Sequence, residues 1–173
     1  SSGGVVYGEC KESPDERKPF LFPLSPYGIS KLAIEKYIFY YYKTFGLIFT
    51  IFRYGNVYGP KQDPFGEAGV VAIFSKRMID NKDIYIFGNG KQIRDYVYVD
   101  DVAKANLLAI KKGNNNVFNI GLGRSTSVNT LFNLMEKIAE YKKTPIYKPK
   151  RTGELQRSSL DVKKAKKFLN WST

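Results

Sequence analysis

A chain of 173 residues with 43% hydrophobic and 15% aromatic residues is long enough to form one globular domain with a core, and too apolar to be disordered. Because it has no histidine and one cysteine, disulfide frameworks, the usual zinc sites and histidine-based catalytic triads are excluded, and we expect no metal site. The net charge of +12, from 28 Lys and Arg against 16 Asp and Glu, suits an anionic partner such as a phosphate.

Much of the positive charge falls in residues 142–150 and 163–167, where it is typical of a solvated helix face and its approach. No recognised nucleic-acid-binding motif accompanies this charge, and no apolar run reaches the length of a membrane span, so we expect neither nucleic acid nor a membrane as a partner. The first residues lack the basic-then-apolar order of a secretory signal, which favours a cytoplasmic location.

The first third of the chain predicts one long helix and one buried strand. Residues 5–8 (VVYG) are typical of the exit of a buried strand. Ser25, followed by proline, is an N-cap candidate for a helix over 26–45, which Gly46 would end. The apolar, β-branched run at 47–52 has the length of a buried strand in a parallel sheet.

The rest of the chain alternates helices with short strands. Helices are expected over 70–79, 101–112, 128–141 and 161–171, with Asp100, Asp101, Ser127 and Asp161 at their starts. Short strands are expected at 84–87, 96–99 and 117–120. This alternation indicates an α/β fold, and without an internal repeat or linker we expect residues 1–173 to form a single unit.

Tyr27 and Lys31 are the strongest candidates for chemistry. They lie four residues apart at the start of a predicted helix, so both should project from one face, with the tyrosine near the positive end of the helix dipole. An ammonium and a helix N-terminus can bring a phenol, with a pKa of about 10 in isolation, toward the working range of a general base. An isolated Tyr-x-x-x-Lys pair is also common on helix surfaces, so the sequence around it decides.

Six blocks around this pair carry a resemblance to a known family. In order they are SSGGVVYG (1–8), SPYGISK (25–31), RYGNVYGP (53–60), FGNG (87–90), RDYVYVDD (94–101) and NIG (119–121). Together they resemble the extended short-chain dehydrogenase/reductase family, the NAD-dependent epimerases and dehydratases, and within it most closely the UDP-glucose 4-epimerases. The blocks cover nearly the whole chain, and several in order are more specific than any one.

The resemblance implies a Rossmann-like α/β fold, of which this chain is the C-terminal part with the small substrate-binding domain. It also implies a catalytic cycle in which Tyr27 removes the proton of the sugar 4-hydroxyl while C4 passes hydride to NAD. The ketone then turns over in the site and takes the hydride back on its other face. Lys31 is implied to hold the nicotinamide ribose and stabilise the phenolate, and Tyr54 to lie beside the nicotinamide.

The UDP-sugar site implied by the resemblance begins with the diphosphate. Asn56 and the helix start at Gly69 and Val70 match groups that meet it, in keeping with the affinity of helix N-termini for anions. Arg94 matches an arginine that clamps the same diphosphate, a task that suits a planar, forked donor.

The remaining substrate contacts implied by the resemblance lie further along the chain. Tyr85 and Phe87 would line the uracil pocket, while Arg151 would bind phosphate and Glu154 the ribose hydroxyls. Ser158 matches a position whose size gates the sugar's 2-substituent, and this small residue implies tolerance of N-acetylated sugars. Each residue alone could equally serve a turn, a cap, an ion pair or the core, and their joint presence favours a site.

Three departures from the family pattern matter. Gly3 stands where many relatives have a catalytic serine or threonine, so that hydrogen bond would have to come from Ser2. Tyr98 replaces a histidine, a change expected to affect packing. No Gly-x-x-Gly-x-x-Gly segment is present, so the glycine-rich N-terminal half of the dinucleotide-binding fold is absent and we expect this piece to bind NAD poorly and to be inactive alone.

Two alternatives stay open. Nucleotide-sugar 4,6-dehydratases share the fold and the Tyr-Lys pair, but they need an Asp-Glu pair where this chain has residues 3–5 (GGV). The second alternative is a non-catalytic module that binds nucleotide-sugars or only dimerises. A protein that only binds has no use for a phenol with a lowered pKa, which weighs against this alternative. The aromatic helix from Tyr27 to Phe45 is a possible homodimer interface, which is also the family's habit.

Overall fold

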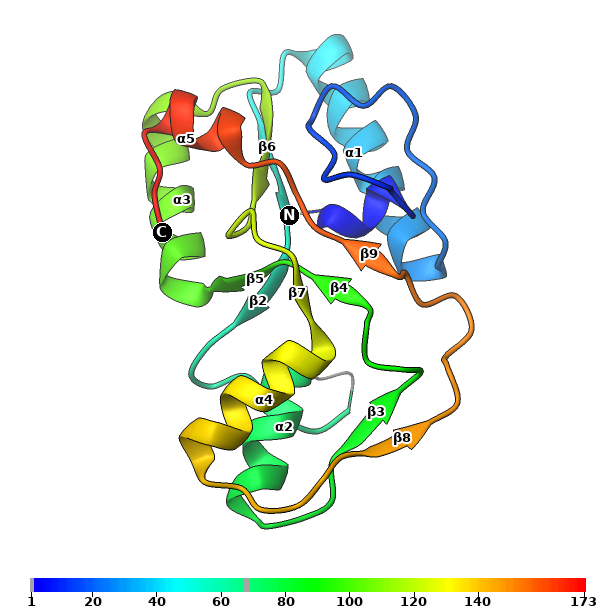
Figure 1. The fold of residues 1–173 in the computed structure, drawn as a ribbon. Coiled ribbons are helices and arrows are strands. Elements are labelled where there is room, and N and C mark those ends of the chain that lie inside the picture. The colour runs from blue at the N-terminus through cyan, green and yellow to red at the C-terminus, as the bar shows by residue number, and fades with distance from the viewer. Residues whose placement is uncertain (1, 67–68) are drawn as a thin grey trace.

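Helices lie on both sides of a parallel strand pair in the upper part of the molecule (Figure 1). The structure, a computed structural model, describes residues 2–66 and 69–173. β1 (Thr50–Tyr54) pairs in parallel with β6 (Asn116–Ile120) along its whole length. α1 (Pro26–Phe45) lies on one side of this pair, and α3 (Val99–Lys112) and α5 (Lys163–Leu169) lie on the other. This arrangement is the layering expected of an α/β fold.

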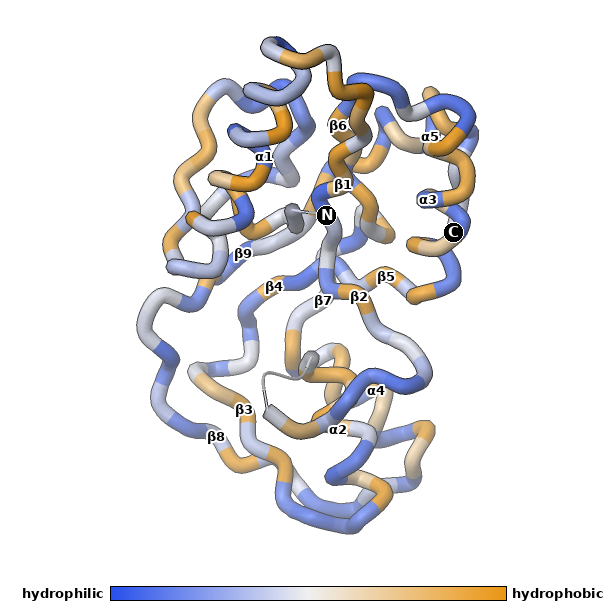
Figure 2. Tube along the Cα trace, turned by 180° about the vertical axis from the view of Figure 1, so that it is seen from behind, coloured by the Kyte–Doolittle hydropathy of each residue, from blue (hydrophilic) through white to orange (hydrophobic). Residues whose placement is uncertain are grey.

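A second set of elements forms the lower part of the molecule. α2 (Val70–Ile79) packs against α4 (Val128–Ala139), and β3 (Tyr85–Phe87) pairs in parallel with β8 (Ile146–Lys148). Each part has its own cluster of buried hydrophobic side chains, one around β1 and β6 and the other between α2, α4 and β3. Seen from behind, hydrophobic stretches of chain follow β1 and β6 above and α2 and β3 below (Figure 2).

Short strands join the two parts. β2 (Asn56–Tyr58) continues from β1 and pairs in parallel with β5 (Tyr96–Tyr98). β4 (Ile93–Arg94) pairs antiparallel with β7 (Thr126–Ser127) and parallel with β9 (Arg157–Ser158). The chain segments that leave β1, β4 and β9 therefore meet in the middle of the molecule, which is where the candidate site lies.

The ends of α1 are fixed by the predicted signals. Ser25 accepts a hydrogen bond from the backbone N–H of Gly28, with Pro26 at the first helical position. Gly46 follows the helix in the left-handed conformation, at φ 71°. The backbone N–H of Leu47 then bonds back to the carbonyl of Tyr41, so Leu47 closes the helix. The predicted start of the next strand at residue 47 is therefore wrong, and β1 begins at residue 50.

Other differences from the sequence-based expectations are local. Residues 4–7 form a 3-10 helix, η1 (Gly4–Tyr7), in place of the expected strand exit. Tyr98, with no side-chain bond, occupies the N-cap of α3, and the predicted cap residues Asp100 and Asp101 lie inside its first turn. Val162 caps α5, although Asp161 does accept the backbone N–H of Lys163. Ser127 caps α4 as predicted, through the N–H of Thr130.

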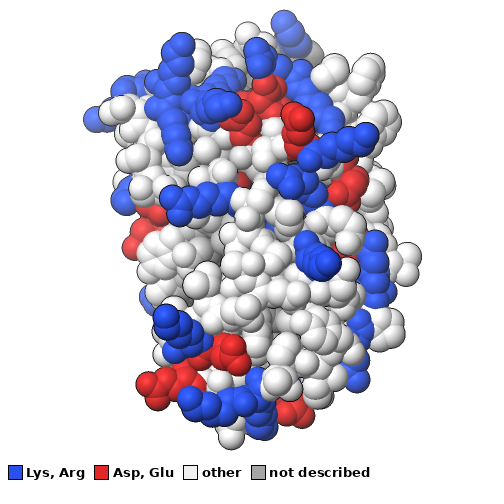
Figure 3. All heavy atoms as spheres, in the orientation of Figure 1, with Lys and Arg blue, Asp and Glu red and all other residues white. Residues whose placement is uncertain are grey.

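Surface charge is unevenly distributed. Figure 3 shows Lys and Arg side chains gathered over the α5 end of the molecule, and α5 itself has the sequence KKAKKFL. The middle of the same face is largely uncharged, and basic and acidic side chains mix at its lower edge. Within the described residues, no helix combines the length and the apolar character that crossing a membrane requires.

Candidate active site

Two adjoining cavities lie where the upper and lower parts of the molecule meet. Their volumes are about 580 Å³ and 460 Å³, within the range of small-molecule sites. Asn56, Gly69, Arg94 and Glu154 line both, so the two cavities form one continuous cleft. The cleft brings together residues from α1, β2, α2, β4 and the segment before β9.

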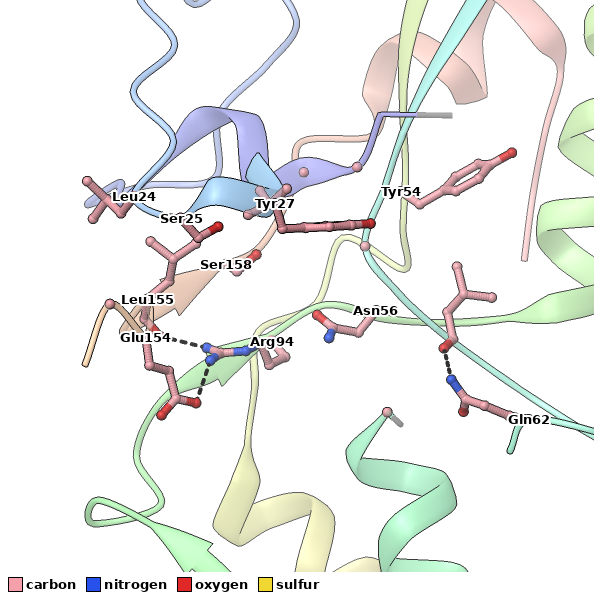
Figure 4. A pocket seen from close by; sticks show the side chains of 17 residues that line it. Leu24, Ser25, Tyr27, Tyr54, Asn56, Gln62, Arg94, Glu154, Leu155 and Ser158 are labelled. Carbon is pink, nitrogen blue, oxygen red and sulfur yellow. Dashed lines mark hydrogen bonds and ion pairs between the residues drawn. The ribbon is translucent and has the colours of Figure 1, made fainter. Parts of the chain in front are cut away.

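Tyr27 lies at one end of the cleft, with Lys31 beside its ring. The Tyr27 side chain is 60% exposed and lines the first cavity, extending toward the chain that carries Tyr54 and Asn56 (Figure 4). The Nζ atom of Lys31 lies 5.4 Å from the centroid of the Tyr27 ring. The two side chains therefore share a face of α1. Tyr27 lines the cleft that also contains Asn56 and Arg94, whereas Lys31 is not among the described residues that line either cavity. This is the geometry on which the enzyme interpretation depends.

Arg94 lies at the middle of the cleft, held from three sides. Its Nη1 atom donates to the carbonyls of Ile93 and Leu155 at 2.8 and 2.9 Å, and its Nη2 atom donates to Oε1 of Glu154 at 2.9 Å. The guanidinium is mostly buried beside the carboxylate. Figure 4 draws its bonds to Glu154 and Leu155 as dashed lines. The hydrogen bonds fix the plane of the fork before any ligand arrives.

The start of α2 faces Arg94 across the cleft. Gly69 occupies the N-cap without a side-chain hydrogen bond, and no acidic residue lies in the first turn. The first backbone N–H groups of a helix lack partners within the helix and carry its positive pole. With Asn56 and Arg94 beside it, this end of α2 offers an anion several hydrogen-bond donors.

The second cavity carries aromatic rings with cations against them. The guanidinium of Arg151 lies 3.8 Å from the centroid of the Phe87 ring. Tyr85 has the guanidinium of Arg77 at 5.0 Å and the ammonium of Lys148 at 5.1 Å. Phe87, Tyr85, Arg77 and Arg151 all line this cavity, which therefore suits a flat, polar aromatic group close to negative charge.

The comparisons with known proteins agree on one family. Residues 1–121 match the model of the NAD dependent epimerase/dehydratase family. The chain belongs to this family. The crystal structure of the UDP-glucose 4-epimerase of Thermotoga maritima with UDP-glucose is 53% identical, with a TM-score of 0.95 over 99% of this chain and 56% of that one.

Two further relatives support the same assignment. The UDP-glucose 4-epimerase of Mycolicibacterium smegmatis is 41% identical over 99% of this chain and 55% of its own length. The UDP-glucose 4-epimerase of Thermus thermophilus, solved in complex with NAD, is 38% identical with a TM-score of 0.90, over 99% of this chain and 57% of that one. The chain thus spans about half the length of the relatives it matches. The predicted family and the Rossmann-like α/β fold are confirmed, and the family is one that depends on NAD.

Within this epimerase/dehydratase fold, most of the predicted substrate residues line the cleft. The first cavity includes Ser158, and the second includes Val70 together with the aromatic pair described above. Arg151 and Glu154 also line the cleft, where Glu154 bonds to Arg94 and Arg151 stacks on Phe87.

Tyr54 contributes its ring to the cleft, whereas Ser2 lies outside it. Tyr54 lines the first cavity, but its hydroxyl group points away from Tyr27 (Figure 4) and accepts a hydrogen bond from Asn106 at 3.0 Å. Burial raises the pKa of the Tyr54 phenol. Ser2 is buried, and its hydroxyl donates to Glu35 at 2.5 Å, so the structure does not bring it into the cleft with Tyr27.

The sequence analysis missed several residues that line the cleft. Tyr96 could have been found, because it lies two residues after Arg94, and side chains two apart in an extended segment point to the same side. Between them, Asp95 points to the interior and accepts the N–H groups of Leu122, Gly123 and Leu160, which anchors this segment. The other missed residues, which no periodic pattern marks, include Leu24, Ser25, Gln62, Arg77, Gln92 and Leu155.

Replacing Tyr96 with phenylalanine should make the protein less sensitive to alkali. The Tyr96 hydroxyl is buried without a hydrogen-bond partner among residues 2–66 and 69–173, and burial raises its pKa to about 12. Between pH 10 and 12 the Tyr96 hydroxyl therefore stays protonated in the folded protein but loses its proton in the unfolded chain. The contribution of this group to the free energy of unfolding is complete below pH 10 and is lost as the pH rises to 12. At pH 8 we expect the Tyr96→Phe variant to have a free energy of unfolding near that of the wild type. Between pH 10 and 12 the variant should lose about 3 kcal/mol less of this free energy than the wild type does. Urea unfolding at each pH measures this, and an unchanged loss would contradict it.

Proposed function

We propose that the full-length protein is an NAD-dependent nucleotide-sugar 4-epimerase of the UDP-glucose/UDP-galactose type, to which this chain contributes the catalytic pair and the substrate site. The observation that carries the proposal is the single cleft with Tyr27 at one end, Arg94 in the middle and Phe87 at the other. Its order of a proton-transfer group, anion-binding groups and an aromatic pocket matches the order of sugar, diphosphate and base in a UDP-sugar.

Substrate binding follows from this order. The diphosphate lies against the start of α2, where it receives hydrogen bonds from backbone N–H groups, from the Asn56 amide and from the Arg94 fork. The uracil enters the second cavity beside Tyr85 and Phe87, while Arg151 covers the nearby phosphate. Glu154, within reach of the ribose, accepts from its hydroxyls. The sugar then extends into the first cavity toward Tyr27.

The chemical step assigned to this chain is a proton transfer. The Tyr27 oxygen accepts the proton of the sugar 4-hydroxyl and later returns it, acting first as general base and then as general acid. Lys31, with its ammonium over the Tyr27 ring, stabilises the phenolate form and hydrogen-bonds the nicotinamide ribose. Bound NAD would supply the acceptor for the hydride of C4 and the donor that restores it. Tyr54 flanks this end of the cleft with its ring.

The residues at this end fit the nicotinamide part of the cofactor. The Tyr27 ring lines the cavity together with the backbone of Gly3 and Gly4, and the Lys31 ammonium lies 5.4 Å from the centroid of that ring. An added Cβ on Gly4 would meet Leu160 at 2.9 Å. The family's glycine-rich segment, which holds the dinucleotide's phosphates, is not part of this sequence. We therefore expect the 173-residue chain alone to be inactive, and the catalysis to belong to a chain that carries both parts.

The experiment that tests the proposal uses the full-length protein with UDP-galactose and NAD. Formation of UDP-glucose, followed by a coupled assay, is the expected result. Release of a 4-keto-6-deoxy sugar would instead identify a dehydratase. Binding of UDP-sugars without turnover would identify a non-catalytic module.

The carboxylates of the cleft favour the epimerase over the dehydratase. Among the described residues that line the first cavity, Glu154 is the one carboxylate, and it is paired with Arg94. Elimination of water needs both an acid and a base near the sugar. Residues 3–5, where the dehydratases carry their acidic pair, supply neither.

Ser158 is proposed to set tolerance for the sugar's 2-substituent. Its small side chain lines the first cavity together with Tyr27. Replacing it with tyrosine fills that space, and should lower kcat/KM for UDP-N-acetylglucosamine by at least about tenfold with little change for UDP-glucose. Steady-state kinetics with both substrates measure the ratio. Equal losses on both sugars would show that this position does not read the 2-substituent.

The exposed face of α1 supports a proposed homodimer. Tyr37, Tyr40, Tyr41 and Phe45 are large aromatic side chains on this helix with at least 49% of their surface exposed. Aromatic side chains gathered in this way are typical of interfaces. Sedimentation velocity of the full-length protein measures its oligomeric state, and a monomer at assay concentration would contradict the proposal.

A further inference from the structure

α1 carries a buried acidic residue in line with the catalytic pair. Tyr27, Lys31 and Glu35 follow one another at intervals of four residues, so they lie along one face of the helix. Glu35 is 1% exposed, whereas Tyr27 is 60% exposed. The face that presents the phenol to the cleft therefore continues directly into the interior.

Glu35 binds an arginine on β1 through two hydrogen bonds. The Nε atom of Arg53 donates to Oε1 of Glu35 at 2.9 Å, and its Nη2 atom donates to Oε2 at 2.6 Å. Arg53 is 4% exposed, so the pair is shielded from water on both sides. The Ser2 hydroxyl donates to the same Oε1 atom. This two-point geometry fixes the rotation of one side chain against the other.

The remaining nitrogen of Arg53 extends the network. Its Nη1 atom donates to the Tyr7 hydroxyl at 2.8 Å, which donates to Oδ1 of Asn119 on β6 at 2.8 Å. The Asn119 amide in turn donates to the carbonyls of Pro14 and Asp161. Burial raises the pKa of Tyr7 to about 12, so its phenol stays protonated as this donor at neutral pH. Every polar side chain of the network thus has a partner.

α1 has few buried residues that could fix its orientation, although Leu32 packs against the upper core and the rings of Phe39 and Tyr42 contact that of Phe49. Of its twenty residues, all of them described, Gly28 and Glu35 are the buried ones, while most of the large apolar side chains are exposed. An added Cβ on Gly28 would meet the Cβ atom of Pro23 at 2.7 Å, so the helix start is closely packed. Gly28 and Glu35 therefore hold the helix on either side of Lys31.

Arg53 holds the opposite wall of the cleft. It lies on β1 next to Tyr54, and the same chain then supplies Asn56 to both cavities. We propose that the Glu35–Arg53 pair is a positioning device, which sets the distance and angle of Tyr27 and Lys31 relative to the wall formed by Tyr54 and Asn56. This inference rests on the proposed function. It assigns to the pair an effect on turnover beyond its effect on folding.

A positioning role and a merely structural role predict different behaviour. A buried ion pair is a weak source of net stability, and apolar side chains of similar volume often replace one without loss of folding. Such a replacement lacks the directional bonds that fix the helix. A misplacement of about 1 Å at a catalytic group can lower the rate by about a hundredfold.

The test is the double variant Glu35→Leu/Arg53→Met of the full-length protein. We expect a melting temperature near wild type, UDP-galactose KM within about twofold, and kcat lowered by about tenfold to a hundredfold. Wild-type kcat in the folded double variant would overturn the inference. The matched control on the same helix is Lys36→Met, an exposed residue next to Glu35, which should leave kcat unchanged.

A second variant covers the case in which the double variant does not fold. Arg53→Lys keeps the charge and loses the fork, so we expect a folded protein with kcat lowered and UDP affinity, measured by calorimetry, unchanged. Wild-type kcat in a folded Arg53→Lys protein would overturn the inference. The Tyr27→Phe variant shows whether the positioning role or the proposed function has failed. Full activity of Tyr27→Phe refutes the proposed function. If Tyr27→Phe is inactive while Arg53→Lys has wild-type kcat, only the positioning role is refuted.

Discussion

Replacing Tyr27 with phenylalanine in the full-length protein should lower kcat for UDP-galactose by about 10² to 10⁴-fold, with little change in the affinity for UDP. The substitution removes the oxygen that accepts the proton of the sugar 4-hydroxyl, and a positioned general base contributes a factor of this size. The ring remains, and with it the packing beside the Lys31 ammonium. Steady-state kinetics and calorimetry with UDP separate the two effects.

The matched control is Tyr37→Phe on the same helix. Tyr37 is 67% exposed and lines neither cavity of the cleft, so the loss of its hydroxyl should leave turnover unchanged. Equal activity of the Tyr27→Phe protein and the wild type would remove Tyr27 from the chemistry. Equal loss in both variants would indicate damage to α1 and leave the proton transfer unassigned to Tyr27.

Element positions followed from the sequence where a local signal decides them. The bounds of α1 were predicted because a serine cap, a proline and a left-handed glycine act within one turn of the helix ends. α2 was predicted at its observed bounds. The start of β1 was missed, because Leu47 and Ile48 continue the apolar pattern while lying on the surface, at 47% and 64% exposure. Hydropathy alone cannot separate such a linker from a buried strand.

The candidate site was predictable as a set of residues, less so as a set of contacts. The blocks of the sequence identify Tyr27, Asn56 and Arg94, and the structure brings them into one cleft. Pairing depends on side-chain directions that only the packed chain determines, so the bond from Arg94 to Glu154 was not foreseen. The same holds for Ser2, whose hydroxyl meets a carboxylate 33 residues away.

Arg94→Lys should weaken UDP binding by about tenfold to a hundredfold. In the free protein the Arg94 guanidinium is bonded to the carbonyls of Ile93 and Leu155 and to Glu154, so its plane is set before the ligand arrives. A lysine has the charge but a single nitrogen, and cannot satisfy these groups and a phosphate together. Hydrogen bonds to charged groups are worth about 1.5 to 3 kcal/mol each, and about 1.4 kcal/mol corresponds to a factor of ten.

Calorimetry with UDP in place of a UDP-sugar isolates this effect, because UDP lacks the sugar that reaches Tyr27. Arg124→Lys, at an exposed arginine that lines neither cavity of the cleft, is the control and should bind UDP as the wild type does. Glu154→Gln should cost less than Arg94→Lys, since two carbonyls still hold the arginine in place. If Arg94→Lys binds UDP as tightly as the Arg124 control does, the diphosphate does not lie at the middle of the cleft, and the order of sugar, diphosphate and base proposed for it is wrong.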